Sequence, residues 1–347
     1  MQHGQHRILY MVQTPDYALL AAAAQQLARL GLAVAVDDAA TPIDSDQDAR
    51  LHVRWHGGEA YYQVETKRGL RPALLGAVAH QLRRRGPDAL LVADHVSPPL
   101  AERLRALGLQ FIDTAGNAFL THPPLLVWVK GERPAQALAA PAVGRAFQAS
   151  GLRVLFALLT LPGLAHAPYR VIAEQAGVAH GTVGWVMTEL PQLGFLGAIG
   201  GRRRVLQPER LLRQWVEAYA RTLRPKLLLK TLRAPTTAWW RALDLRDCAL
   251  VLGGEAAAAR LHRTIEPEVL TLYGAKADLR RFMVQHPLPE DPRGNVEILE
   301  QFWHFAPDPP ELAPRLLIYA DLLATGDARC LEAAQALEGG ILDRFAG

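Results

Sequence analysis

The segment from residue 169 to residue 207 constrains the fold more than any other stretch of this chain. Residues 169–176 predict a short helix, and Gly177 then supplies the left-handed backbone that ends a helix at little cost. A second helix is predicted over residues 180–193. Ala173 stands where two helices cross closely, and the apolar residues that follow it at helix-turn-helix spacing are Val178, Val183 and Val186.

A basic hairpin is predicted directly after these helices. Two short strands within residues 195–206 meet at Gly200-Gly201, a pair that suits a tight turn. Three arginines stand at the tip, namely Arg202, Arg203 and Arg204, where they suit contacts with phosphates or entry into a minor groove. With an apolar helix over residues 152–161, these features predict a winged helix-turn-helix over residues 151–207. The alternative is a helical hairpin and a β-hairpin with no role in DNA binding.

In a helix-turn-helix the second helix enters the major groove. The side chains expected to face the bases lie opposite Val183 and Val186, and they are His180, Thr182, Trp185 and Thr188. The predicted partner is therefore double-stranded operator DNA, and the predicted function is sequence-specific regulation of transcription.

The distribution of charge favours the same partner. The 347 residues carry a net charge of only +4, and half are hydrophobic, so the chain is globular rather than disordered. Between Gly201 and Arg233, however, ten basic residues face only Glu209 and Glu217, a local net charge of +8. Such a concentration beside a helix-turn-helix indicates a nucleic-acid partner. The alternative is a solvated helix face, which we favour for residues 210–221 taken alone.

Several other classes of protein are not expected. Cys248 and Cys330 are too few and too far apart for a disulfide framework. No glycine-rich phosphate loop and no paired His–Cys metal spacing occurs, so we expect no cofactor and no metal. Neither a signal peptide nor an apolar run long enough to span a membrane is present, so we expect a cytoplasmic protein.

Residues 1–130 predict an α/β domain in the order helix, three strands, helix, strand. A strand that carries Glu65 and Lys67, followed by a helix with Gln81, resembles the PD-(D/E)xK core of the restriction-endonuclease fold. Alternate residues point to the same side of a strand, and carboxylates bind Mg²⁺ through hard oxygens. The second acid would have to be Asp48 or Asp46, which precede the strand predicted from Leu51.

The alternative function is thus a nuclease that uses Asp48, Glu65 and Lys67. We expect instead an inactive scaffold in which Glu65 and Lys67 form an ion pair.

Asp113 and Asn117 flank Gly116 in a predicted tight turn, because Asp and Asn side chains form hydrogen bonds with the backbone of turns. A polar ligand site at Asp113 and Asn117 is the other possibility.

Residues 131–150 are rich in Ala, Pro and Gly and predict a linker.

Residues 208–347 predict a second α/β domain. In it, Gly253-Gly254 after a strand resembles the opening of nucleotidyltransferase-like folds. Such an enzyme needs two metal-binding acids on its next strand. Glu266 and Glu268 are the only acids at a fitting distance, and Pro267 between them cannot donate to a central ladder. We therefore expect no working metal pair.

The chain as a whole resembles the AbiEi-type antitoxins of type IV toxin–antitoxin systems. The matching segments are Val64-Glu-Thr-Lys67, residues 112–117, Gly254-Glu-Ala-Ala257 and residues 319–327. The resemblance implies a winged helix that binds operator DNA and represses its own operon. It also implies a C-terminal domain that counters a nucleotidyltransferase-like toxin without a stable complex. The simplest family members begin at the winged helix, so a regulator with no toxin is a further alternative.

Overall fold

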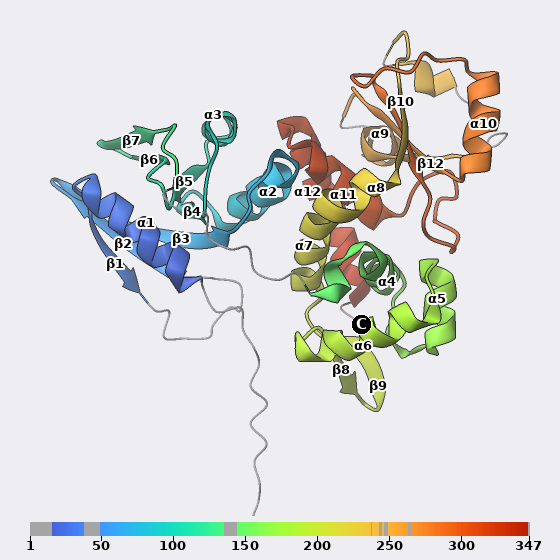
Figure 1. Ribbon diagram of the computed structural model, residues 1–347, viewed down its shortest axis with the longest axis horizontal. Helices are drawn as coiled ribbons and strands as arrows, with labels where there is room; N and C mark the ends of the chain where they lie inside the picture. Colours follow the sequence, from blue (N-terminus) through green and yellow to red (C-terminus); the bar gives the residue numbers. More distant parts are fainter. Residues whose placement is uncertain are drawn as a thin grey trace, which may run out of the picture. The chain divides into compact units, whose positions relative to one another are not determined.

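The computed structural model describes residues 16–37, 49–134, 144–236, 238–242, 245, 249–262 and 265–345. The chain divides into two compact units, Met1–Ala142 and Val143–Gly347, each of which is described by itself (Figure 1). The division falls within the stretch predicted as a linker. Asp46, Asp48 and Cys248 lie outside the described residues.

The N-terminal unit is built on a curled sheet of seven strands in sequence order (Figure 1). The strands are β1 (Ala33–Asp37), β2 (Ala49–Trp55), β3 (Gly58–Lys67), β4 (Ala89–Ala93), β5 (Gln110–Asp113), β6 (Ala118–His122) and β7 (Leu125–Val129). β3, β4 and β5 pair in parallel, and the other neighbours pair antiparallel. The helices are α1 (Tyr17–Arg29), α2 (Leu75–Arg85) and α3 (Pro98–Ala106). The predicted order of helix, three strands, helix and strand is confirmed.

One face of this sheet packs against α1. Leu19, Ala23 and Leu27 of α1 recur every four residues and are fully buried. They meet alternate residues of β2 and β3, among them Leu51 and Val64, because side chains alternate between the two faces of a strand. β2 begins at Ala49, two residues before the predicted start, and Ala49 pairs with Val64.

The C-terminal unit begins with three helices and a hairpin: α4 (Ala149–Thr160), α5 (Tyr169–Ala176), α6 (His180–Gln192), β8 (Leu196–Ile199) and β9 (Arg202–Val205). The predicted bounds of α5 and the turn at Gly200-Gly201 are confirmed. Gly177 has φ of +61°, as expected for the residue that ends α5. Val183 and Val186 of α6 are fully buried.

A four-stranded sheet of order β10-β13-β12-β11 follows. Its strands are β10 (Leu228–Leu232), β11 (Val251–Gly253), β12 (Leu270–Gly274) and β13 (Val296–Glu300), and its helices are α7 (Pro208–Ala218), α8 (Arg224–Leu227), α9 (Gly254–His262), α10 (Lys276–Gln285), α11 (Arg315–Thr325) and α12 (Ala328–Leu342). A π-helical turn, Tyr219–Leu223, joins α7 to α8. The helical segment thus continues to Leu227, and Leu228–Leu232 then pair with β13. α10 is a helix that the sequence analysis did not predict.

A buried carboxylate ties this sheet to two helical segments. Asp321 of α11 accepts hydrogen bonds from the hydroxyls of Tyr219 and Tyr273, each at 2.8 Å, and from Arg224 Nε at 3.1 Å. Arg224 also contacts Glu297 of β13 at 2.6 Å. Burial raises the pKa of the Asp321 carboxyl, and Arg224 and the two hydroxyls oppose that rise. Burial also raises the pKa of both tyrosines well above the ordinary value, so both hydroxyls remain donors at neutral pH.

We predict that Asp321→Ala lowers the free energy of unfolding by about 3–5 kcal/mol, because it breaks a buried ion pair with Arg224 and removes the carboxylate that accepts from two buried tyrosine hydroxyls. Urea unfolding followed by circular dichroism measures the change. Asp291→Ala is the matched control: it also removes the partner of an arginine, Arg233, but at an exposed site where ion pairs contribute little. Equal losses in the two variants would contradict the prediction.

Candidate nucleic-acid interface

One face of α6 is left uncovered by the rest of the described structure. His180 and Thr188 are exposed, and Thr182 and Trp185 are half-buried. A side chain at Gly181 or at Gly184 would meet nothing within 4 Å. The Thr188 hydroxyl donates to the carbonyl of Gly184 at 2.9 Å, so part of its bonding capacity is used within the helix. The four residues expected to face bases are therefore all accessible, to different degrees.

The hairpin β8–β9 has two different faces. Ile199 pairs with Arg202, and Gly197 pairs with Arg204, so these four residues share one face. Arg202 and Arg204 are exposed, and Ile199 retains 54% of its surface. Ala198 pairs with Arg203 on the other face. The exposed face thus carries an apolar side chain opposite Arg202 and a glycine opposite Arg204.

Arg203 is half-buried and is bound to the helices. Its guanidinium donates to the carbonyl of Ala167 at 2.8 Å and lies 4.9 Å from the ring centre of Tyr169, at the start of α5. The side chain therefore fixes the hairpin to the helices. Of the three arginines expected at DNA, Arg202 and Arg204 have the exposure that a phosphate contact needs, and Arg203 does not.

Several basic residues between Gly201 and Arg233 pair with acids from outside this stretch, so its surface is less positive than its residue count suggests. Arg224 contacts Asp321 and Glu297, Lys230 pairs with Glu290, and Arg233 pairs with Asp291 at 2.9 Å. Arg210 lies 4.9 Å from the ring centre of Phe195. The local net charge of +8 therefore overstates the footprint, because acids 58 to 97 residues later in the chain offset three of these cations.

The N-terminal unit brings Glu65 and Lys67 together. Lys67 Nζ lies 2.9 Å from Glu65 Oε1, and Arg85 of α2 pairs with the other carboxylate oxygen. Arg85 also donates to the carbonyl of Val64 at 2.7 Å. Glu65 is buried, with 7% of its surface exposed, and Gln81 is buried on α2. The ion pair expected for an inactive scaffold is present, and a metal at Glu65 would have to compete with two cations.

Asp113 and Asn117 form the predicted turn. One oxygen of the fully buried Asp113 carboxylate accepts from the backbone N–H groups of Ala115, Gly116 and Asn117, each at 2.9 Å. The Asn117 side chain bonds to Asp113 and to the backbone of Glu132. These bonds occupy both side chains, so the structural interpretation is confirmed.

Comparison with known proteins identifies one part of the chain. Residues 204–344 match the family model described as "Transcriptional regulator, AbiEi antitoxin, Type IV TA system". This segment is an AbiEi antitoxin family domain. The match does not extend to the N-terminal unit. No curated protein and no solved structure matches the chain.

The AbiEi domain does not assemble the acid pair of a nucleotidyltransferase. Glu266 and Glu268 precede β12, where Glu266 pairs with Arg241 at 2.6 Å and Glu268 pairs with Arg329 at 2.8 Å. The strand itself carries Thr271 and Tyr273, both buried. Within the described ranges, no three His, Cys, Asp or Glu side chains are grouped to hold a metal ion, and no helix is long and apolar enough to cross a membrane.

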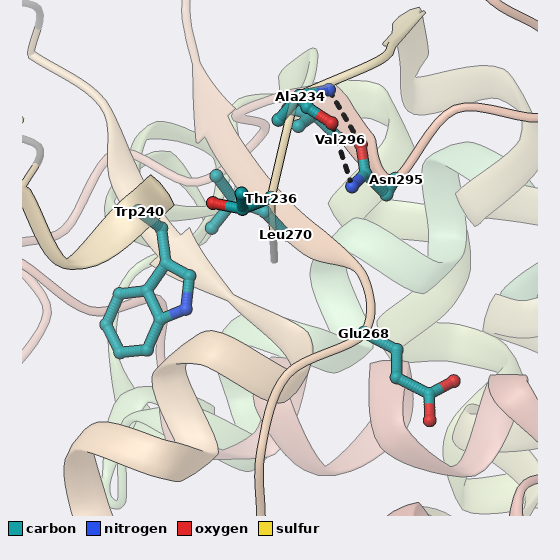
Figure 2. A pocket seen from close by; sticks show the side chains of 7 residues that line it. All are labelled: Ala234, Thr236, Trp240, Glu268, Leu270, Asn295 and Val296. Atoms are coloured by element: carbon teal, nitrogen blue, oxygen red, sulfur yellow. Dashed lines mark hydrogen bonds between the residues drawn. The ribbon is translucent and has the colours of Figure 1, made fainter. Parts of the chain in front are cut away.

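A small pocket of the AbiEi domain is too tight for a nucleotide. Figure 2 shows it between Trp240, Leu270 and Asn295, and its volume is about 10 Å³, the room of one water molecule. The Asn295 side chain spans its rim, accepting from the N–H of Ala234 at 2.7 Å and donating to the same residue's carbonyl at 3.3 Å. These two hydrogen bonds hold Ala234 against the residue that precedes β13.

Proposed function

We propose that this protein is a DNA-binding transcriptional repressor that regulates its own operon, as an antitoxin of the type IV class. The observation that carries the proposal is the uncovered face of α6 beside the exposed arginines of the hairpin. The AbiEi family match over residues 204–344 supports it, because that family comprises transcriptional regulators.

The geometry supports a winged helix-turn-helix mode of binding. α6 would enter the major groove with His180 and Thr182 at its leading end, since the N-terminal residues of a recognition helix contact base edges. Gly181 and Gly184 allow the helix backbone to approach a groove closely, which compensates for the cost of about 1 kcal/mol of a glycine within a helix. Arg202 and Arg204 would bind phosphates or enter the adjacent minor groove.

The direct experiment is a mobility-shift titration with the DNA upstream of the protein's own coding sequence. We expect retention of that duplex at concentrations at which a scrambled duplex of equal length stays free. Equal affinity for the two duplexes would contradict operator recognition.

The antitoxin role is tested separately, by co-expression with a nucleotidyltransferase-like toxin from the same operon. We expect this protein to rescue growth without co-purifying with the toxin.

A metal-dependent nuclease of the PD-(D/E)xK class is the second candidate. The spacing of Glu65 and Lys67 and the strand order of the N-terminal unit favour it. The pairing of Glu65 with Lys67 and Arg85 argues against it, because a single carboxylate already neutralised by two cations binds Mg²⁺ weakly. We infer that the N-terminal unit is a scaffold without nuclease activity.

The first prediction separates the arginines of the hairpin. Arg202→Ala and Arg204→Ala should each weaken binding to every duplex and reduce the slope of log K against log salt by about one, the effect of one lost phosphate contact. Arg203→Ala is the matched control, since its guanidinium binds Ala167: it should lower the melting temperature and leave the slope nearly unchanged. Equal slopes in all three variants would show that the hairpin does not touch phosphates.

The second prediction concerns base recognition. The double variant His180→Ala/Thr182→Ala should lose about 1–3 kcal/mol of operator preference per lost base contact, with residual binding to scrambled DNA unchanged. Gln192→Ala, which is exposed at the other end of α6, should keep the preference. Fluorescence anisotropy with both duplexes measures the ratio. A parallel loss on both duplexes would mean that His180 and Thr182 orient the helix without reading bases.

The third prediction tests the nuclease alternative. Purified protein should cleave neither duplex nor single-stranded DNA with Mg²⁺ or Mn²⁺, and Glu65→Ala should leave operator affinity nearly unchanged. Glu59→Ala, on the exposed part of the same strand, is the control. Metal-dependent nicking that survives in Glu59→Ala and disappears in Glu65→Ala would establish the nuclease instead.

A further inference from the structure

A short aromatic segment of the AbiEi domain reaches the turn of the helix-turn-helix. This strap, residues 301–305, leaves the end of β13 with the sequence Gln-Phe-Trp-His-Phe. Gln301 N–H donates to the carbonyl of Gly274 at 3.0 Å and so continues the sheet. The strap is therefore attached to the sheet at one end. In the sequence it comes more than 120 residues after the turn that joins α5 to α6.

Two contacts join the strap to the turn between α5 and α6. His304 N–H donates to the carbonyl of Gln175 at 3.1 Å, and thus satisfies one of the carbonyls that a helix leaves free at its C-terminus. A Cβ placed on Gly177 would lie 2.7 Å from the carbonyl oxygen of Phe302 and 3.2 Å from the ring of His304. Gly177 therefore serves the close approach of the strap as well as the left-handed turn.

Aromatic packing fixes the strap on the helices. The Phe156 ring of α4 has its centre 4.9 Å from Phe302, 6.0 Å from Trp303 and 5.8 Å from Phe305. Arg153, one turn earlier on α4, lies 5.7 Å from the ring centre of Phe302. All three aromatic strap residues are at least nine-tenths buried. A segment held in this way does not slide along the helices.

We propose that the strap is a positioning element for DNA reading: it sets the orientation of α6 by holding the turn that begins it. The proposal rests on the proposed function and extends it, because it assigns a role in operator recognition to residues far from the helix-turn-helix. α6 starts three residues after Gly177, so a displacement of the turn is passed to His180 and Thr182 at the leading end. The operator-reading unit then includes the AbiEi domain.

The experiment compares two glycines that share a backbone conformation and differ in their surroundings. Gly177 has φ of +61° and Gly194, just after α6, has φ of +75°, but a Cβ at Gly194 would meet nothing within 4 Å. Asn tolerates the left-handed conformation. In the full-length protein, Gly177→Asn therefore pushes against the strap, and Gly194→Asn does not.

We expect Gly177→Asn to lower the ratio of operator to scrambled-duplex affinity about tenfold, the worth of one base contact, with affinity for the scrambled duplex unchanged. Gly194→Asn should keep the ratio. A second pair of variants tests the same contact should Gly177→Asn fail to fold. His304→Pro removes the backbone N–H that donates to Gln175, and His304→Ala keeps it. His304→Pro should reproduce the loss, and His304→Ala should not.

Amide hydrogen exchange without DNA gives an independent readout. Residues 177–183 should exchange faster in Gly177→Asn and His304→Pro than in their controls, while the amides of β12 and β13 stay protected. Unchanged exchange, or a loss of preference shared equally by variants and controls, would overturn the proposal. If the unmodified protein fails to distinguish operator from scrambled DNA, the proposed function fails. Faster exchange confined to residues 177–183 would then still establish that the strap holds the turn.

Discussion

The packing around Phe156 is the interaction on which the C-terminal unit depends. Its ring stacks on Trp215 of α7 at 5.4 Å and also contacts the three aromatic residues of the strap. Trp215 in turn stacks on Tyr219 at 5.0 Å, and its indole N–H donates to the carbonyl of Leu152 in α4. One continuous aromatic core therefore belongs both to the helix-turn-helix and to the AbiEi domain. Each large ring buries enough apolar surface to make separation of the two costly.

The charged residues of this unit fall into two groups with different physical roles. Arg224 forms an ion pair with the buried carboxylate of Asp321. An unpaired ion at a buried site would lower the free energy of unfolding, so this pair stabilises the fold. Arg202 and Arg204 are exposed on one face of the hairpin. Arg203, between them in sequence, belongs to the first group because strand geometry turns it towards Tyr169. Neighbouring arginines of one strand thus differ in surroundings: Arg203 contacts the protein, and Arg202 and Arg204 are exposed.

This division explains which features the sequence could predict. α5, Gly177 and the hairpin turn depend on local preferences, and their positions followed from residue spacing. β10 is absent from the predicted elements because its strand state depends on β13, some 65 residues later. The count of +8 along the sequence overstates the positive surface for the same reason, since the acids that pair with three of these cations are distant in sequence. The Gln-Phe-Trp-His-Phe run after a strand was the one available signal for the strap, but nothing local indicates that its backbone meets Gly177.

The family match covers residues 204–344, whereas the C-terminal unit begins at Val143, so the aromatic core extends beyond the matched segment. The match begins at Arg204, inside β9, so it includes only the end of the hairpin. A boundary at residue 207 would cut between β9 and α7, although Arg210 of α7 lies over Phe195 and Leu212 and Trp215 are buried. Severing the strap from the turn would leave the Gln175 carbonyl without its donor and expose the Phe156 ring. The helices α4 to α6 and the AbiEi domain therefore share one aromatic core, and a change that loosens that core acts on both.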